Sequence, residues 1–169
     1  MKKYKQLQNT SVRLYKHGDF KEVFDIFVKF QKDAKIGTYY NTTKGHSDIF
    51  VIMYLIEELK KLIQKSEHSY VGIDNETGKI WGFACFTKSV IRKNSIDLQL
   101  TFKDPDYYFN RVVKGALLLT FKKVRKEGRI FAALGPREKF NKYIDFVKRI
   151  FKIKVIGQDN FNRIYVEFL

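Results

Sequence analysis

Few side chains in this sequence are suited to metal or nucleophilic chemistry. It contains one cysteine, Cys85, and three histidines, His17, His46 and His68. One thiol can form neither an internal disulfide nor a cysteine cluster for zinc, and the histidines lack the HxxxH or HExxH spacing of metal ligands. We therefore expect no metal site. The single thiol favours a reducing compartment.

A large excess of positive charge is the other chemical feature of the chain. Lysine and arginine number 33 against 18 aspartate and glutamate residues, which gives a net charge of +15. Such a field attracts anions of every kind, including nucleic acid, cofactor phosphates and acidic protein surfaces. A lysine-rich surface that only maintains solubility is the alternative interpretation.

The densest positive charge falls on two predicted helices in the second half of the chain. The charged positions are Lys122, Lys123, Arg125, Lys126, Lys139, Lys142, Lys148, Arg149 and Lys152. Aromatic residues lie between them, but at the spacing of a buried stripe, so they are not free to stack on bases. If nucleic acid binds here, we expect contacts to phosphates without base readout, and a steep dependence on salt.

The length and composition indicate one globular unit. At 169 residues the chain has the size of a single domain, 1–169, and its hydrophobic fraction of 44% can fill a core. The first residues are polar, which argues against a signal peptide. No run reaches the ~18 apolar residues of a membrane span. We therefore expect a cytoplasmic protein without membrane contact.

Hydrophobic periodicity predicts the elements that position these side chains. Alternation predicts strands at 11–15, 70–73, 79–87, 95–102, 130–134, 152–156 and 163–169. The 3.6-residue period predicts helices over the apolar stripes at 23–30, 49–63, 113–124 and 140–151, with a loop at 36–45. A strand–helix–strand unit in the middle predicts one parallel pair, and the hairpins around it predict antiparallel pairs. The expected fold is α/β: a mixed, mostly antiparallel twisted sheet of about seven strands with helices on both faces.

The same periodicity predicts which side chains are buried in two of these elements. The helix at 49–63 is expected to bury Ile49, Ile52, Met53, Ile56, Leu59 and Ile63. The strand at 95–102 is expected to turn one set of side chains to each face of the sheet. These sets are Ile96, Leu98, Leu100 and Phe102, against Asp97, Gln99 and Thr101.

The order and spacing of these elements resemble those of the GNAT N-acetyltransferase superfamily over nearly the whole chain. Residues 11–19, followed by the helix at 23–30, look like the opening strand and first helix of that family. The run Ile-Trp-Gly-Phe at 80–83 is similar to its hydrophobic-x-Gly-hydrophobic step, and residues 100–107 look like its fourth strand running into a Pro-Asp/Glu-Tyr loop. The resemblance implies an acyl-CoA-dependent N-acyltransferase that moves an acetyl group from acetyl-CoA to an amine.

The family binds the CoA pyrophosphate at a Gln/Arg-x-x-Gly-x-Gly/Ala loop that opens the helix after the fourth strand. The best match is Arg-Val-Val-Lys-Gly-Ala at 111–116, where Lys114 replaces the central glycine. A side chain obstructs close approach of a phosphate, whereas the lysine ammonium can bind one. The resemblance also implies that the two parallel strands separate toward this helix, leaving room for the pantetheine arm. The implied cofactor contacts are Leu100, Phe102, Arg111, Val112, Lys114, Gly115 and Ala116. Alternatively, residues 112–119 are only the apolar start of a helix and bind no phosphate.

The resemblance also implies catalytic groups. Many family members use a tyrosine of the fourth helix as the acid that protonates the departing thiolate, but that position is Val147 here. Tyr143, one turn earlier on the same face, either takes that role or packs in the core. The general base for the amine is expected to be Asp97, with Gln99, Glu57 and Glu58 as further options.

These departures from the family pattern describe a degenerate member and leave two other functions open. One is a catalytically inactive GNAT-fold protein that contacts protein neighbours in an assembly such as a bacteriophage particle, in which case its location is the virion. A composition rich in Lys, Asn, Ile and Phe would suit a phage with a low-GC genome. The other is a non-specific binder of nucleic acid or of an acidic partner through the basic helices.

Overall fold

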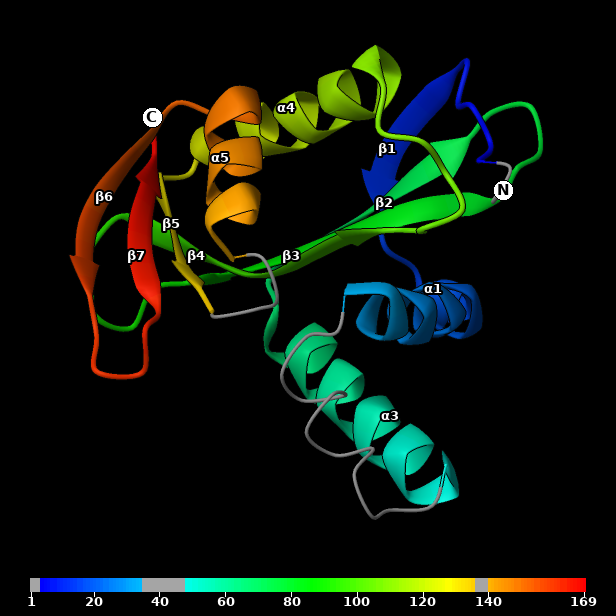
Figure 1. Cartoon of the computed structure of the whole chain (residues 1–169), viewed down its shortest axis with the longest axis horizontal. Coiled ribbons are helices and arrows are strands. Elements are labelled where there is room, and N and C mark those ends of the chain that lie inside the picture. Colours follow the sequence, from blue (N-terminus) through cyan, green and yellow to red (C-terminus); the bar gives the residue numbers. More distant parts are fainter. Residues whose placement is uncertain (1–3, 35–47, 136–139) are drawn as a thin grey trace.

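The computed structural model describes residues 4–34, 48–135 and 140–169 (Figure 1). One sheet has the strand order β1-β2-β3-β4-β5-β7-β6, in which β4 and β5 run parallel and the other neighbours antiparallel. The strands are β1 (Thr10–Leu14), β2 (His68–Asp74), β3 (Ile80–Lys88), β4 (Ser95–Lys103), β5 (Arg129–Leu134), β6 (Ile153–Gln158) and β7 (Ile164–Phe168). The predicted α/β class, the order of the elements along the chain and the one parallel pair are confirmed, while the predicted loop at 36–45 lies outside the described residues.

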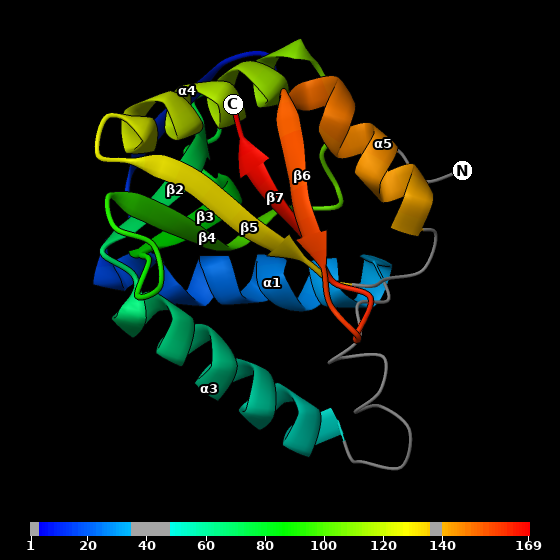
Figure 2. The same ribbon diagram turned by 90° about the vertical axis from the view of Figure 1, so that its left-hand side faces the viewer.

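Helices cover the sheet from two sides. They are the short η1 (His17–Asp19), α1 (Phe20–Ala34), α3 (Asp48–Lys65), α4 (Arg111–Arg125) and α5 (Phe140–Ile150). Figure 2 shows α4 and α5 on one side of the sheet, with α1 and α3 on the other. Each layer builds its own apolar cluster, one around Phe86 and Phe121 under α4 and α5, the other around Phe27, Leu59 and Phe83 under α1 and α3.

The buried face of α3 differs from the predicted stripe. Val51, Leu55 and Leu59 are buried, whereas Ile49 and Met53 are 71% and 62% exposed. The N-terminal half of this helix is apolar at nearly every position, so two stripes offset from one another satisfy the helical period equally well. Packing against α1 and the sheet determines which stripe is buried. The helical period of the sequence does not contain this information.

A β-bulge in β4 changes which side chains face which layer. Pairing with β3 runs to Cys85 opposite Leu100 and resumes at Phe86 opposite Leu98, so Gln99 is an extra residue without a partner. Beyond the bulge, Leu100 and Phe102 pack with the α1 and α3 cluster, whereas Ile96 and Leu98 pack with the α4 and α5 cluster. The prediction that all four share one face is therefore wrong, because one inserted residue inverts the alternation.

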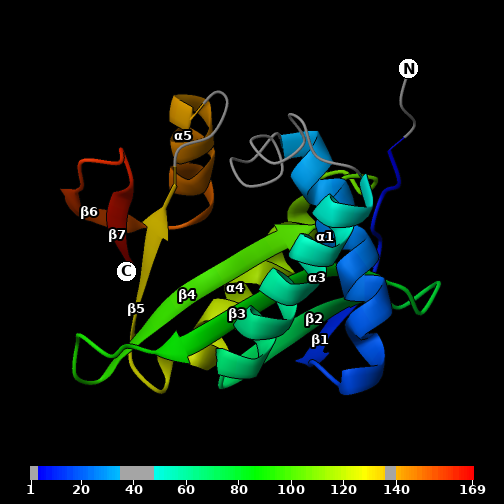
Figure 3. The ribbon, with the colours of Figure 1, turned by 90° about the horizontal axis from the view of Figure 1, so that it is seen from below.

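The parallel strands β4 and β5 separate at the same place. Their pairing starts at Ser95 opposite Arg129 and ends at Leu98 opposite Ala132, although β4 continues to Lys103 and β5 to Leu134. Figure 3 shows the two strands diverging beyond that point. A bulge bends the strand that carries it, so the separation follows from the local register change.

Candidate functional site

A hollow opens on the sheet beside the point where β4 and β5 separate. It lies on the face opposite α5, where no helix among the described residues covers β5, β7 and β6 (Figure 3). Its volume is ≈ 220 Å³, and its walls come from the four strands β4, β5, β6 and β7 and from the turn between β3 and β4. The side chains of interest in it are Ile91, Arg92, Asp97, Gln99, Phe131, Ile156 and Tyr165.

Strand alternation places Asp97 in this hollow. Leu98 turns into the α4 and α5 cluster, so its neighbour Asp97 points to the other face, directly beside its register partner Phe131. The structure thus brings the predicted base to the tip of the strand separation. Gln99, the bulge residue, also lines the hollow, where its amide donates a hydrogen bond of 2.9 Å to Thr87 Oγ1.

Two arginines lie over the Phe131 ring, and only one of them is in an ion pair with a described residue. The Arg92 guanidinium carbon is 4.6 Å from the ring centroid and that of Arg129 is 5.3 Å away. Arg129 also donates two hydrogen bonds of 2.7 Å to the Glu167 carboxylate, which lowers the pKa of Glu167. Arg92 forms no such pair within the described ranges, and neither does Asp97. Arg92 was not among the predicted site residues, because an arginine in a polar turn carries no signal of its role.

The other acidic candidates lie elsewhere. Glu57 and Glu58 are on the outer side of α3, where they pair with Lys60 and Lys61 at 3.3 and 3.6 Å. Such pairs one helical turn apart are typical of a solvated helix surface. They do not line the hollow.

Tyr143 lies on α5, across the sheet from Asp97. Its half-buried side chain packs against the cluster that contains Leu98, Ala132 and Leu134. Val147, which stands where the family pattern has its tyrosine, is buried in the same cluster. The structure therefore does not bring the predicted acid and base together on one face but puts them on opposite sides of the separated strands.

The predicted phosphate-binding residues 111–116 form the first turns of α4 rather than a loop. Asn110 caps this helix by accepting a hydrogen bond of 3.0 Å from the Val113 N–H, and it donates one of 2.7 Å to the Leu7 carbonyl. Val113 and Ala116 are buried against the N-terminal segment, while Arg111 and Gly115 are exposed. The first turn thus has a buried side and an open side.

Contacts at the start of α4 join it to α5. Lys114 Nζ donates a hydrogen bond of 3.2 Å to the Arg149 carbonyl in the last turn of α5, where a cation also suits the helix dipole. The rings of Phe109 and Phe146 meet edge to face with centroids 4.8 Å apart. Lys114 is therefore held beside the α4 start by the neighbouring helix.

The side chains of Leu100 and Phe102 belong to the core. Phe102 is buried, and its ring lies 5.4 to 5.6 Å from those of Phe27, Phe30 and Phe83. Neither side chain faces α4 and α5. Any ligand between the separated strands would therefore meet the main chain of these two residues.

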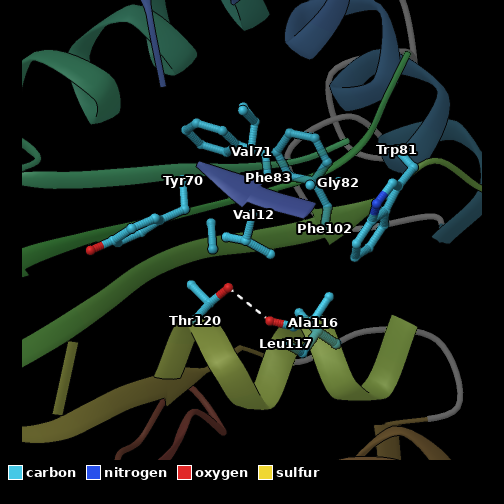
Figure 4. A pocket seen from close by; sticks show the side chains of 12 residues that line it. Val12, Tyr70, Val71, Trp81, Gly82, Phe83, Phe102, Ala116, Leu117 and Thr120 are labelled. Atoms are coloured by element: carbon cyan, nitrogen blue, oxygen red, sulfur yellow. Dashed lines mark hydrogen bonds between the residues drawn. The ribbon is translucent and has the colours of Figure 1, made fainter. Parts of the chain in front are cut away.

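A second hollow, between α4 and strands β1 to β3, is a packing gap (Figure 4). Its volume of ≈ 20 Å³ holds about one water molecule. The figure shows apolar side chains such as Val12, Phe83 and Leu117 around it, and the Thr120 hydroxyl donates to the Ala116 carbonyl at 2.9 Å. A site this small and apolar offers no room for a substrate.

Several of the basic residues on α4 and α5 have structural partners. Besides Lys114, Lys123 donates to the Val12 carbonyl at 3.4 Å, and Arg125 donates to the Phe168 carbonyl. In the described part of the chain, no three potential ligands gather as a metal site would require. No described helix has the length and apolar character to cross a membrane.

No protein-family model and no curated protein matches this sequence. Solved structures do match. The PaiA N-acetyltransferase of Thermoplasma acidophilum, in complex with coenzyme A, shares 15% identity over 96% of this chain and 100% of its own, with a TM-score of 0.68. A GNAT-family acetyltransferase of Staphylococcus aureus Mu50 shares 17% identity over 95% of this chain and 99% of its own, with a TM-score of 0.63.

A third match is named for its substrate. The ribosomal-protein-S5-alanine acetyltransferase of Vibrio fischeri shares 15% identity over 95% of this chain and 92% of its own, with a TM-score of 0.60. At these identities the likeness concerns the fold, since one fold hosts several functions. The chain has the fold of the GNAT acetyltransferases.

Proposed function

We propose that the protein is an acyl-CoA-dependent N-acetyltransferase that transfers an acetyl group to an amine. The observation that carries the proposal is the separation of β4 from β5 beyond Leu98 and Ala132, with Asp97 in a hollow at its tip. Separation leaves the β4 main chain beyond the bulge without its β5 partner, so those polar groups are available to a ligand. The like-folded PaiA enzyme binds coenzyme A, which supports the same use of the fold here.

The start of α4 suits the phosphates of CoA. The N–H groups of the first turn and the positive end of the helix dipole attract anions. A Cβ built on Gly115 meets no other element within 4 Å, so there is open space beside the exposed side of this turn. Arg111 is exposed on it, and the Lys114 ammonium is held near it by the Arg149 carbonyl. We assign cofactor contacts to the main chain of Leu100 and Phe102 and to Arg111, Val112, Lys114, Gly115 and Ala116.

The reaction replaces a thioester bond by an amide bond. Acetyl-CoA supplies the thioester, whose carbonyl carbon forms a bond to the amine nitrogen as the carbon–sulfur bond breaks and its electron pair moves to sulfur. Asp97 accepts the proton that the ammonium must lose before its nitrogen can attack. Tyr143, across the sheet, donates a proton toward the departing sulfur. The amine therefore enters from the open face and the thiol leaves on the side of α4 and α5.

Acetyl-CoA binding tests this proposal before any acceptor is known. At 100 times its Kd, acetyl-CoA should raise the free energy of unfolding of the full chain by about 2.7 kcal/mol. Arg111→Gln should weaken binding, whereas Lys79→Gln removes an equal charge from the distant β2–β3 turn and should not. ATP at the same concentration controls for general anion binding. No stabilisation by millimolar acetyl-CoA would overturn the proposal.

A further inference from the structure

We propose that the hollow beside Asp97 binds a small zwitterionic acceptor, with an ammonium group and a carboxylate on a short apolar scaffold, such as a free α-amino acid. This inference rests on the proposed acetyl transfer for its chemical outcome. Ligand binding itself is inferred from two opposite charges that line the same hollow and do not pair with each other. These charges are the carboxylate of Asp97 and the guanidinium of Arg92.

Both groups are neighbours of one aromatic ring, that of Phe131. Asp97 is the register partner of Phe131, and the Arg92 guanidinium carbon lies 4.6 Å from the centroid of that ring. The cation–π contact holds Arg92 in place without neutralising its charge. Because no described residue forms an ion pair with Asp97 or Arg92, each remains available to a ligand of opposite charge.

Two other charged groups on the same face are already held by partners. Arg129 is held by Glu167 through two bonds of 2.7 Å. Burial would raise the pKa of Asp159, but hydrogen bonds from Arg163 and Tyr165 lower it to about 2. Tyr165 thereby presents its ring, rather than a free hydroxyl, to the hollow. Asp97 and Arg92 differ from these groups in two ways: they line the hollow, and they form no ion pair with a described residue.

The chemistry of each group fixes the orientation of the ligand. A guanidinium group binds a carboxylate through two parallel hydrogen bonds. It repels an ammonium group, which a carboxylate attracts. The ligand carboxylate therefore lies at Arg92 and its ammonium at Asp97. This places the nitrogen at the tip of the strand separation, where the thioester is proposed to lie, and beside the group that takes its proton.

The size and lining of the hollow favour a small molecule. A volume of ≈ 220 Å³ has room for an amino acid but not for a folded partner. Ile91, Ile156 and the Phe131 and Tyr165 rings supply an apolar wall for a side chain. We therefore use L-leucine as the probe, together with L-leucinamide, which lacks the carboxylate charge, and N-acetyl-L-leucine, which lacks the ammonium.

Binding to the full chain is measured by calorimetry without acetyl-CoA, so that recognition is separated from transfer. L-leucine should bind about 10- to 100-fold more tightly than either analogue, because each analogue lacks one of the two charge-assisted hydrogen-bonding groups. Arg92→Gln should abolish the preference over leucinamide, and Asp97→Asn the preference over N-acetyl-leucine. Lys93→Gln removes an equal charge from the same turn and should change neither. Thermal unfolding of each variant verifies that it is folded.

The outcomes distinguish this inference from the proposed function. Equal affinity for leucine and leucinamide, or an unchanged preference in the folded Arg92→Gln variant, overturns the inference. If acetyl-CoA binds and acetyl transfer proceeds equally well to leucinamide, the proposed function stands and the inference fails. If leucine binds through Arg92 and Asp97 but acetyl-CoA does not bind, the recognition site stands and the acetyltransferase proposal fails.

Discussion

The two halves of the sheet differ in how their faces are covered. Strands β1 to β4 lie between α1 and α3 on one side and α4 on the other, whereas β5, β7 and β6 have α5 on one side and a face that no described helix covers on the other (Figures 2 and 3). In the covered half, aromatic rings such as Phe27, Phe83 and Phe102 contact one another. On the open face, the hollow is lined by charged as well as apolar side chains, and Asp97 and Arg92 are in no ion pair with a described residue.

We therefore expect the covered half of the sheet to determine stability and the open face to determine activity. Removing a ring from the covered interior removes dispersion contacts and leaves a cavity, whereas removing a charge from the hollow removes no packing. The border between the halves is β4, where the bulge at Gln99 changes the buried face and ends the pairing with β5. The candidate site lies on this border, at the point where β4 leaves β5.

The largest expected effect is on stability in the covered interior. Phe86 is fully buried, with the rings of Phe121 and Tyr70 at 5.5 and 6.5 Å. Phe86→Ala should lower the free energy of unfolding by about 3–5 kcal/mol. Phe161→Ala, at a position 74% exposed in the β6–β7 turn, should cost less than about 1 kcal/mol. Urea unfolding measures both variants. Equal losses of unfolding free energy would contradict the assignment of stability to the covered interior.

Asp97→Asn should show the opposite pattern on the open face. It removes the proposed base without removing volume, so acetyl transfer should fall by about 100-fold or more. The free energy of unfolding should change by no more than about 0.5 kcal/mol. Glu57→Gln, which removes a solvated carboxylate of α3, is the control and should leave kcat/KM unchanged. A loss of stability without a loss of kcat/KM would assign Asp97 to the fold instead.

A buried hydrogen bond in the covered half should make stability depend on pH. The Tyr107 hydroxyl donates to Asp74 at 2.9 Å. Burial raises the pKa of Asp74, but hydrogen bonds from Thr77, Tyr107 and the Glu76 N–H outweigh it and lower that pKa. Tyr107→Phe should cost about 1.5–3 kcal/mol at neutral pH.

The sign of the pH effect follows from the lowered pKa. The contribution of Asp74 is fully present above the pKa of the unfolded state, near 4, and is lost as pH falls through the lower folded-state pKa. The stability difference between the natural chain and Tyr107→Phe should therefore be constant near neutrality and shrink below about pH 4. A difference that stays constant on acidification would show that Asp74 is not the acceptor that matters.

The smallest effects should come from two glycines that differ in their surroundings. A Cβ on Gly72 would lie 2.5 Å from the Trp81 ring, so Gly72→Ala should cost about 1–3 kcal/mol. A Cβ on Gly115 meets no other element within 4 Å, so Gly115→Ala should stabilise α4 by about 0.5–1 kcal/mol. Thermal unfolding compares the two variants. A destabilised Gly115→Ala variant would show that the space beside that turn is not open.

The candidate site was only partly predictable. Asp97 follows from strand alternation before the bulge, because Ile96 and Leu98 beside it are apolar and turn to the opposite face. Arg92 carried no signal, since its role depends on the fold of a turn onto Phe131. For residues 111–116 the family pattern indicated a loop that opens a helix, and the apolar pattern indicated a helix start. The Asn110 cap and the burial of Val113 and Ala116 make them the start of α4.

The sequence by itself determined the order of the elements, the parallel crossover and the class of the fold, because periodicity and turn residues act over short stretches of chain. Only the tertiary structure decided which stripe of α3 is buried, which way each half of β4 faces, and where β4 leaves β5. These features depend on a competition between neighbouring strands and helices for the same apolar surface. In β4 a one-residue bulge at Gln99 determines which side chains face each layer, and the local sequence pattern does not predict this bulge.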